Sequence, residues 1–183
     1  MSSKLLVISG PSGVGKGSVV KEIMANHSDF VVSVSATTRS PREGEVNGRE
    51  YHFLTEAAFR SAIEKGEMLE HAVVHGSNLY GTPRQPVLDQ LALGHSVILE
   101  IDIQGAQQVK ANFPEAITVF IAPPSMDELA RRLAGRGTET AAEQNIRLAT
   151  AQQEMDSRDR FDFVIVNNDV RDCAAEVVKL TLR

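Results

Sequence analysis

The chain has 183 residues, of which 42% are hydrophobic and 23% charged, and its formal net charge is −5. These values are typical of one globular domain with a sizeable core, and the acidic balance argues against broad nucleic-acid binding, which requires a basic face. The sequence shows no apolar run of membrane-spanning length, no secretory leader and only one cysteine, so we expect a cytoplasmic protein that binds neither membranes nor nucleic acid.

A glycine-rich stretch near the N-terminus, residues 8–18, is the most informative segment. It follows a short apolar run, Leu5–Ile8, that predicts a buried strand, and it precedes a helical pattern that starts near Val19. Strand, glycine-rich turn and helix in this order are typical of a loop that binds phosphates through its backbone N–H groups and the helix N-terminus. Lys16 stands where its ammonium would reach the outer phosphates of a nucleoside triphosphate. A purely structural turn is the alternative interpretation.

One position in this stretch departs from the general phosphate-binding pattern. Gly10 to Lys16 match G-x-x-x-x-G-K, but Gly17 stands where the pattern has Ser or Thr. The departure leaves phosphate binding intact but removes the usual hydroxyl ligand of Mg²⁺. Ser18, one place later, is the predicted hydroxyl, and Glu100 the predicted carboxylate of the metal site. The predicted ATP-binding loop comprises Gly10, Pro11, Ser12, Gly13, Val14, Gly15, Lys16, Gly17 and Ser18.

Apolar strands and helical patterns alternate along the chain. This alternation predicts βαβ crossovers, and therefore an α/β fold in which a parallel sheet carries helices on both faces. Residues 76–82 are predicted as a turn or hairpin. The predicted strands are 5–8, 30–35, 51–53, 68–75, 96–102, 117–121 and 163–166, and the predicted helices are 19–27, 56–65, 84–93, 104–111, 126–133, 139–155 and a last one capped by Asp169.

Residues 36–90 differ from the rest of the chain. Their predicted strands are short and more polar, and they begin with a long polar loop that contains proline and glycine. We therefore predict a small mixed subdomain inserted into a core formed by residues 1–35 and 91–183.

Four polar side chains follow the ends of predicted core strands. Because open parallel sheets bind ligands beyond the carboxyl ends of their strands, we expect these side chains to lie around the phosphate loop. The two-residue spacing of Glu100 and Asp102 predicts that both carboxylates face the same side of one strand. The four residues are Ser35, Glu100, Asp102 and Asn167.

A series of motifs, spread in order over nearly the whole chain, carries a family resemblance. The motifs are residues 10–16 (GPSGVGK), 35–42 (SATTRSPR), 44–48 (GEVNG), Tyr51, Glu70, 80–82 (YGT), 100–105 (EIDIQG), 120–125 (FIAPPS), 136–140 (RGTET) and 166–167 (VN). With these motifs the sequence resembles the guanylate kinases. The resemblance implies a P-loop kinase core, a GMP-binding subdomain at 36–90 and a mobile lid at 135–147. It implies transfer of the γ-phosphoryl of ATP to GMP or dGMP with Mg²⁺, in purine metabolism and GMP recycling.

The resemblance also implies which residues bind GMP. Arg39 and Arg42 would hold its phosphate, since guanidinium forks bind phosphate oxygens in a bidentate manner. Tyr51 and Tyr80 would add hydroxyl groups. Glu70 would accept hydrogen bonds from N1–H and the amino group of guanine, which adenine does not offer. The remaining base contacts would be Ser35, Thr82 and Asp102. Apart from the resemblance, a solvated basic loop and a surface carboxylate on an edge strand would explain the same residues.

Three further arginines resemble those that close over the phosphates in this family. They are Arg132, Arg136 and Arg147. With Lys16 they are the predicted catalytic groups, because phosphoryl transfer depends mainly on positioning and on stabilising charge. Asn167 resembles a contact to the adenine of ATP. The alternatives are helix-surface ion pairs for the arginines and a turn role for the asparagine.

Two other functions are compatible with the same fold. Guanylate-kinase-like domains in scaffold proteins bind partner peptides, but these domains typically lose phosphate-loop residues, whereas this chain keeps Lys16 and its arginines. A kinase for another nucleoside monophosphate would keep the loop and change the base site, so Glu70→Gln would then barely alter the use of GMP.

Overall fold

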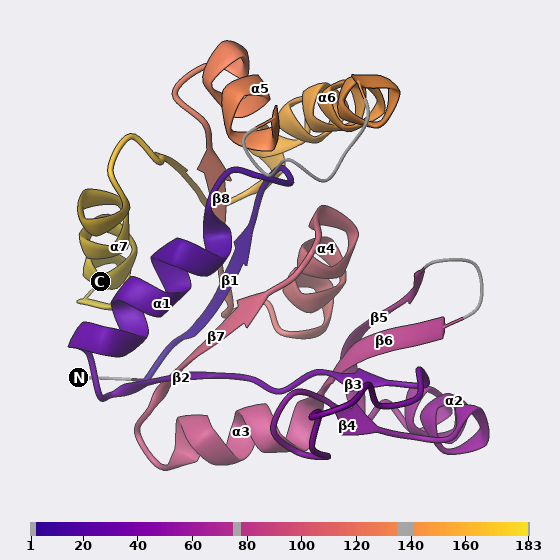
Figure 1. The fold of residues 1–183 in the computed structure, drawn as a ribbon. Coiled ribbons are helices and arrows are strands. Elements are labelled where there is room, and N and C mark those ends of the chain that lie inside the picture. Colours follow the sequence, from indigo (N-terminus) through magenta and orange to yellow (C-terminus); the bar gives the residue numbers. More distant parts are fainter. Residues whose placement is uncertain (1–2, 75–77, 135–140, 183) are drawn as a thin grey trace.

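The computed structural model of this protein describes residues 3–74, 78–134 and 141–182, and in this part of the chain it contains two β-sheets (Figure 1). The larger sheet is wholly parallel, with the strand order β2-β7-β1-β8-β9. Its strands are β1 (Leu5–Ser9), β2 (Phe30–Val32), β7 (Ser96–Glu100), β8 (Ile117–Ala122) and β9 (Phe163–Val166). The predicted α/β fold with a central parallel sheet is therefore confirmed.

Helices cover both faces of this sheet, which explains why its strands are almost continuously apolar. Side chains of β1 alternate between the two faces: Leu6 and Ile8 pack on one side, Leu5 and Val7 on the other. The first side is covered by α1 (Lys16–Asn26), α5 (Met126–Ala134), α6 (Ala141–Met155) and α7 (Val170–Lys179), and the second by α3 (Arg84–Ala92) and α4 (Ile103–Asn112). Short 3₁₀ helices η1 (Arg158–Arg160) and η2 (Leu180–Leu182) follow α6 and α7.

The second sheet lies between β2 and β7 in the chain and has the strand order β4-β3-β6-β5. It is mixed, because β3 and β4 are parallel while the other pairs are antiparallel. Its own small core gathers Ala36, Phe59, Met68 and Leu79 under one helix. The elements are β3 (Ala36–Thr37), β4 (His52–Phe53), β5 (Met68–Val74), β6 (Asn78–Pro83) and α2 (Glu56–Glu64). The boundaries of the GMP-binding subdomain and of the lid remain predictions.

Two of the predicted strands end earlier than expected. The strand predicted at 30–35 ends at Val32, because the chain then leaves the parallel sheet to enter the second one at β3. The region predicted as a turn or hairpin at 76–82 contains most of β6, which pairs with β5 in the antiparallel manner of a hairpin. The strand predicted at 96–102 ends at Glu100, and Asp102 instead accepts a hydrogen bond from Gly105 N–H at 2.7 Å as the N-cap of α4. The two carboxylates therefore do not share one face of a strand.

Three helix starts were predicted more accurately than these strand ends. Thr55, Ser125 and Asp169 each accept a hydrogen bond from a backbone N–H group in the first turn of the following helix, as expected for N-caps. Among the described segments, no helix combines the length and apolar character that crossing a membrane requires. Residues 135–140 of the predicted lid, with Arg136, lie outside the described residues.

Candidate active site

The phosphate loop joins β1 to α1, at the carboxyl end of the parallel sheet. Two of its glycines are required by close neighbours and by positive φ angles of 142° and 99° at Gly10 and Gly15. A side chain at Gly10 would collide with the carbonyl oxygen of Ile121, and a Cβ at Gly15 would lie 2.6 Å from Asn167 Nδ2. Ile121 on β8 and Asn167, the residue that follows β9, thus pack closely against the loop.

Lys16 turns back over this loop. Its Nζ donates to the carbonyl oxygens of Gly10 at 2.6 Å and Pro11 at 3.1 Å. Burial lowers the pKa of Lys16, while the carboxylates of Glu100 and Glu154 oppose that shift. The ammonium is therefore poorly hydrated and is held by carbonyl groups that an anionic ligand could replace.

A cavity of about 360 Å³, here called the loop cavity, opens in front of this lysine. Its lining consists of Ser12, Gly13, Gly15, Lys16, Gly17, Ser18, Lys21 and Glu100. A Cβ at Gly17 would lie 3.7 Å from both carboxylate oxygens of Glu100, so the position that usually carries the metal-binding hydroxyl faces a carboxylate here. Oxygen ligands of this kind suit Mg²⁺. Within the described residues, no group of three or more His, Cys, Asp or Glu side chains could hold a metal by itself.

A second cavity of about 450 Å³, here called the arginine cavity, opens between the two sheets. It brings together seven of the predicted GMP-site residues: Ser35, Arg39, Arg42, Tyr51, Glu70, Tyr80 and Asp102. Glu45, Ala72, Gly81, Glu100 and Ile101 complete its lining. Glu100 lines both cavities, so this one carboxylate marks the place where they meet.

Arg39 is held in a fixed orientation inside the arginine cavity. Its Nη1 and Nη2 donate to the two carboxylate oxygens of Glu45, both at 2.9 Å, and Nη1 also donates to Ser40 O at 2.7 Å. The guanidinium carbon lies 5.5 Å from the ring centre of Tyr51 and 5.7 Å from that of Phe53. The hydrogen bond between Arg39 and Glu45 raises the pKa of the arginine and lowers that of the glutamate. Both groups are therefore charged at neutral pH.

The three hydrogen bonds that Arg39 donates to Ser40 and Glu45 do not involve one edge of its guanidinium group. They occupy both protons of Nη1 and one of Nη2. The Nε proton and the second Nη2 proton point along the other edge of the group and form a two-donor fork. The Tyr80 side chain also interacts with Arg39, and this fork together with the Tyr80 hydroxyl suits the binding of a phosphate.

Glu70 is buried, with only 6% of its surface exposed, so the alternative of a surface carboxylate is wrong. Thr82 Oγ1 donates to its Oε1 at 2.7 Å, and a Cβ at Gly105 would lie 3.0 Å from its Oε2. Burial raises the pKa of Glu70, the Thr82 hydroxyl opposes this shift, and the negative charge of Asp102 adds to it. Thr82 itself does not line the arginine cavity. The structure places its hydroxyl behind Glu70, where it orients the carboxylate.

Arg132 and Asn167 both contact the phosphate loop. Arg132 donates to Val14 O at 3.2 Å and to Asn167 O at 3.1 Å, while Asn167 Nδ2 donates to Val14 O at 2.8 Å. Arg132 also forms the expected helix-surface ion pair, with Glu128 at 2.9 Å. The side-chain oxygen of Asn167 is buried and has no hydrogen-bond partner within the described part of the chain. Both residues therefore support the loop, whatever else they contact when a nucleotide is bound.

The remaining predicted residues are Ser18, Arg147 and Arg136. Ser18 is exposed and lines the loop cavity, and Arg147 lies half-buried on α6. Arg136 falls in the segment outside the described residues. The structure thus brings together the phosphate loop and most of the GMP-site residues, and it leaves the lid arginine Arg136 as a prediction.

Sequence reasoning missed three charged residues near the site. Lys21 lies one turn after Gly17 on α1 and lines the loop cavity. Glu45 lies within the motif G-E-V-N-G but was assigned no role. Glu154 lies seven residues after Arg147, which places both on one face of α6. Burial raises the pKa of Glu154, while Lys16 and the backbone N–H of Ser12 favour its charged form. The sequence indicated a position for Glu154 near the site only through its helical spacing from Arg147.

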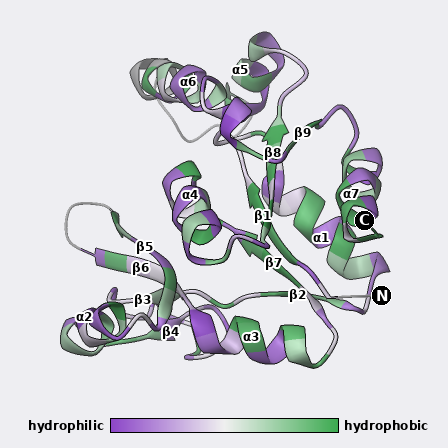
Figure 2. Cartoon of the chain, turned by 180° about the vertical axis from the view of Figure 1, so that it is seen from behind, coloured by the Kyte–Doolittle hydropathy of each residue, from purple (hydrophilic) through white to green (hydrophobic). Residues whose placement is uncertain are grey.

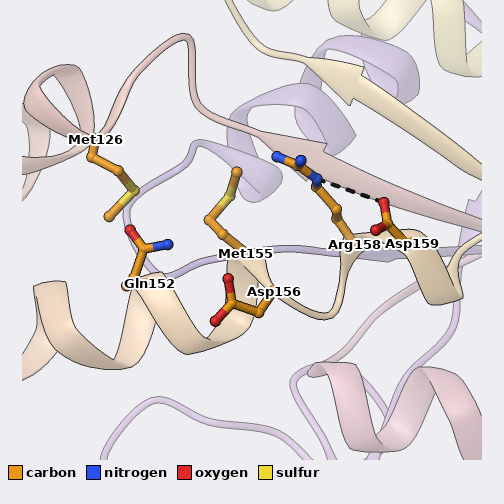
Figure 3. A pocket seen from close by; sticks show the side chains of 6 residues that line it. All are labelled: Met126, Gln152, Met155, Asp156, Arg158 and Asp159. Atoms are coloured by element: carbon orange, nitrogen blue, oxygen red, sulfur yellow. Dashed lines mark ion pairs between the residues drawn. The ribbon is translucent and has the colours of Figure 1, made fainter.

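Figure 3 shows a third cavity, of about 390 Å³, near the start of α5, the end of α6 and η1. Its polar lining includes an ion pair between Arg158 and Asp159 at 3.6 Å. The residues that line it are Met126, Gln152, Met155, Asp156, Arg158 and Asp159. None of them is a predicted site residue, so this cavity does not belong to the pair that meets at Glu100.

Two cavities that share a carboxylate, one on a phosphate loop and one lined by arginines, suit a phosphoryl donor and an anionic acceptor that bind side by side. This arrangement defines the class as a P-loop kinase of nucleoside monophosphates. The family model described as guanylate kinase matches residues 2–182. The chain belongs to the guanylate kinase family, as the sequence motifs predicted.

Individual relatives agree with this assignment. The guanylate kinase of Leifsonia xyli subsp. xyli is 53% identical, over 97% of this chain and 70% of its own length. That of Gloeobacter violaceus is 51% identical, over 97% of this chain and 86% of its own. A crystal structure of guanylate kinase from Anaplasma phagocytophilum covers 99% of this chain and 85% of its own, with 34% identity and a TM-score of 0.74.

Proposed function

We propose that this protein transfers the γ-phosphoryl of ATP to GMP or dGMP and so produces ADP and GDP or dGDP. The observation that carries the proposal is the position of Glu100 in both cavities. A triphosphate bound on the loop and a monophosphate bound on the arginines would bring their terminal phosphates toward this shared region. Membership of the guanylate kinase family supports the same reaction.

The loop cavity is the proposed ATP site. The loop N–H groups and the N-terminus of α1 favour an anion at this place. Lys16 would exchange the carbonyl oxygens of Gly10 and Pro11 for phosphate oxygens, since its poorly hydrated ammonium gains more from a charged partner than from neutral ones. Asn167 would contribute to the adenine site.

The arginine cavity is the proposed GMP site. The second fork of Arg39 would take the phosphate in a bidentate manner while Glu45 keeps the guanidinium in place. Arg42, Tyr51 and Tyr80 would supply further donors. The ionised Glu70 would accept N1–H and the amino group of guanine, with Ser35 and Asp102 around the base and Thr82 behind the carboxylate. Adenine would offer this buried carboxylate no donor at either position, so only the Thr82 hydrogen bond would remain, and this loss disfavours AMP.

Transfer needs no dedicated base in this arrangement. An anionic oxygen of the GMP phosphate attacks the γ-phosphorus, and the bond from that phosphorus to the β-γ bridging oxygen breaks, so ADP leaves with the bond's electron pair. Lys16 and the lid and core arginines Arg132, Arg136 and Arg147 would stabilise the charge on the transferring group. The segments 36–90 and 135–147, as GMP-binding subdomain and lid, would close over the two nucleotides and exclude water.

Mg²⁺ is the proposed cofactor. Ser18 and Glu100 contribute oxygen atoms to the loop cavity, and Gly17 leaves space in front of the Glu100 carboxylate. These groups would hold the ion directly or through water, with the ATP phosphates as its main ligands. When bound, Mg²⁺ neutralises negative charge on the β- and γ-phosphates.

A cytoplasmic location is also a proposal. The single cysteine of the chain, Cys173, is buried, and burial raises its pKa to about 11. This thiol stays protonated at neutral pH and serves as a small core side chain, which fits a reducing compartment.

The direct test is a panel of nucleoside monophosphates. GMP, dGMP, AMP, CMP and UMP are each supplied with ATP and Mg²⁺, and ADP formation is measured. The proposal predicts that GMP and dGMP are preferred and that the product carries the transferred phosphoryl. Equal use of AMP, or no turnover with GMP, would contradict it, and peptide binding without nucleotide binding would favour a scaffold domain.

A further inference from the structure

Strand β5 is an edge strand whose outer side faces helix α4 (Figures 1 and 2). One side-chain amide binds both backbone groups of His71 on this side: Gln108 Oε1 accepts from His71 N–H at 3.1 Å, and Gln108 Nε2 donates to His71 O at 3.0 Å. One turn along the helix, Asn112 Nδ2 donates to Leu69 O at 2.8 Å. We call these three hydrogen bonds the α4 clamp.

The spacing of the clamp matches both elements. Four residues along a helix rise about 6 Å, and two residues along a strand span about 6.6 Å. Gln108 and Asn112 therefore meet His71 and Leu69 in register, with strand and helix running in opposite directions. The Leu69 side chain is fully buried and packs in the same cluster as Val109 of α4. The clamp thus fixes where β5 lies along the length of α4.

Glu70 lies between the two clamped residues of β5. Its carboxylate reaches the first turn of α4, where a Cβ at Gly105 would lie 3.0 Å from Oε2. On its other side Oε1 accepts from Thr82 at 2.7 Å. A shift of β5 along α4 would open or compress the contact at Gly105 and so rotate the carboxylate away from the position that these neighbours define.

We propose that Gln108 is a positioning residue for guanine selection, which acts through the backbone of His71 on the adjacent Glu70. This inference rests on the proposed role of Glu70 as the acceptor of N1–H and the amino group of guanine. Two hydrogen bonds to one planar carboxylate require its plane to match that of the base. Thr82 holds the carboxylate from within the second sheet, and the clamp adds a fixed position of β5 relative to α4.

The test is Gln108→Met, which keeps the length of the side chain and removes the amide. The KM for GMP rises about tenfold to a hundredfold, since a misplacement of about 1 Å has effects of this order. The KM for ATP changes by less than about twofold. Inosine monophosphate lacks the 2-amino group of GMP. The ratio of kcat/KM for GMP to kcat/KM for inosine monophosphate falls by about the same factor by which the KM for GMP rises. A merely structural glutamine would lower Tm and leave this preference unchanged.

The matched control is Gln107→Met on the same helix. Gln107 donates to Arg160 O at 3.4 Å and is not part of the clamp. This variant keeps the GMP preference of the wild type. Gln108→Glu is the second variant: it keeps the acceptor for His71 N–H, loses the donor, and gives an intermediate KM for GMP. It decides the question if Gln108→Met does not fold.

A GMP preference that is unchanged in folded Gln108→Met or Gln108→Glu overturns the proposal. Glu70→Gln separates this failure from a failure of the proposed function. If Glu70→Gln loses the preference while the Gln108 variants keep it, the guanine site is sound and the clamp has no part in selection. If Glu70→Gln also keeps the preference, the guanine site itself is wrong.

Discussion

The loop cavity and the arginine cavity are built in different ways. Apart from Glu100, the described residues that line the loop cavity all lie between positions 12 and 21, and much of the cavity's binding capacity lies in the backbone. The arginine cavity is assembled from side chains that lie between residues 35 and 102. The first cavity is local in sequence and recognises a group common to many ligands. The second depends on tertiary structure and determines which acceptor is used.

The largest effect is expected from Lys16→Met, which tests the loop side of this comparison. The rate constant kcat/KM falls by about 10³-fold, or ~4 kcal/mol, because the charged group over the phosphates is lost. GMP binding measured by calorimetry stays unchanged. Lys21→Met, a second lysine of the same cavity, is the control and has a smaller effect. An equal loss of GMP affinity in Lys16→Met would show that the cavities are not independent.

The next effect is expected from Glu70→Gln, which tests the arginine side. The amide presents a donor to the guanine donors, so kcat/KM for GMP falls by about 10² to 10³-fold while the KM for ATP is retained. Glu67→Gln, an exposed glutamate just before β5, serves as the control. Initial rates with GMP and AMP report the change. If GMP and AMP respond alike, Glu70 does not select the base.

The two cavities also differed in how far sequence could predict them. The phosphate loop follows from local pattern, because glycines, a lysine and flanking elements in fixed order leave few other structures. Residues of the arginine cavity were assigned through family motifs. Their charged loop alone did not distinguish a binding site from a solvated surface. The burial of Glu70 and the location of Glu100 in both cavities depend on how the two sheets pack, which no local pattern contains.

The fold shows the same division. Parallel strands and helix caps were predicted correctly, since hydrophobic runs and capping residues act locally. The wrong predictions fell where the chain changes from one sheet to another or from a strand to a helix, at Val32 and at Asp102. The role of Thr82 behind Glu70 and the clamp by Gln108 involve partners 12 and 37 residues away, which sequence alone could not reveal.

A moderate effect is expected from Arg39→Lys. Lysine keeps the charge but cannot bind Glu45 and a phosphate through two forks at once. The KM for GMP rises about tenfold, with little change for ATP. Arg49→Lys is the control, because Arg49 forms an ion pair with Glu50 but is largely exposed. An unchanged KM for GMP in Arg39→Lys would show that Arg39 serves only its ion pair with Glu45.

A smaller effect is expected from pH. Burial raises the pKa of Glu70 above its ordinary value of 4.5. Protonation removes an acceptor for guanine, so kcat/KM for GMP falls on acidification at a higher pH than an ordinary carboxyl group would give. The GMP phosphate, with a second pKa of about 6, titrates nearby. The pH profile of Glu70→Gln separates the titration of Glu70 from that of the GMP phosphate, because this variant lacks the carboxyl group and still uses the same phosphate. Identical profiles would contradict the assignment.

The smallest effect is expected from Gly17→Ser. Among the described residues, a Cβ at this position would meet the Glu100 carboxylate, at the ordinary contact distance of 3.7 Å. The added hydroxyl faces the proposed metal site, and the KM for ATP changes by no more than about threefold in either direction. A large loss of activity with normal Tm would mean that Glu100 needs the open space in front of Gly17.

The most direct test of two adjoining cavities is calorimetric titration with GMP, performed with and without a saturating non-hydrolysable ATP analogue and Mg²⁺. Separate cavities that meet at Glu100 predict that GMP binds with equal or higher affinity when the analogue is present, with one GMP per chain in both cases. Competition, seen as a GMP affinity that falls steadily as the concentration of the analogue rises, would show that both nucleotides use one cavity and would contradict the proposed arrangement.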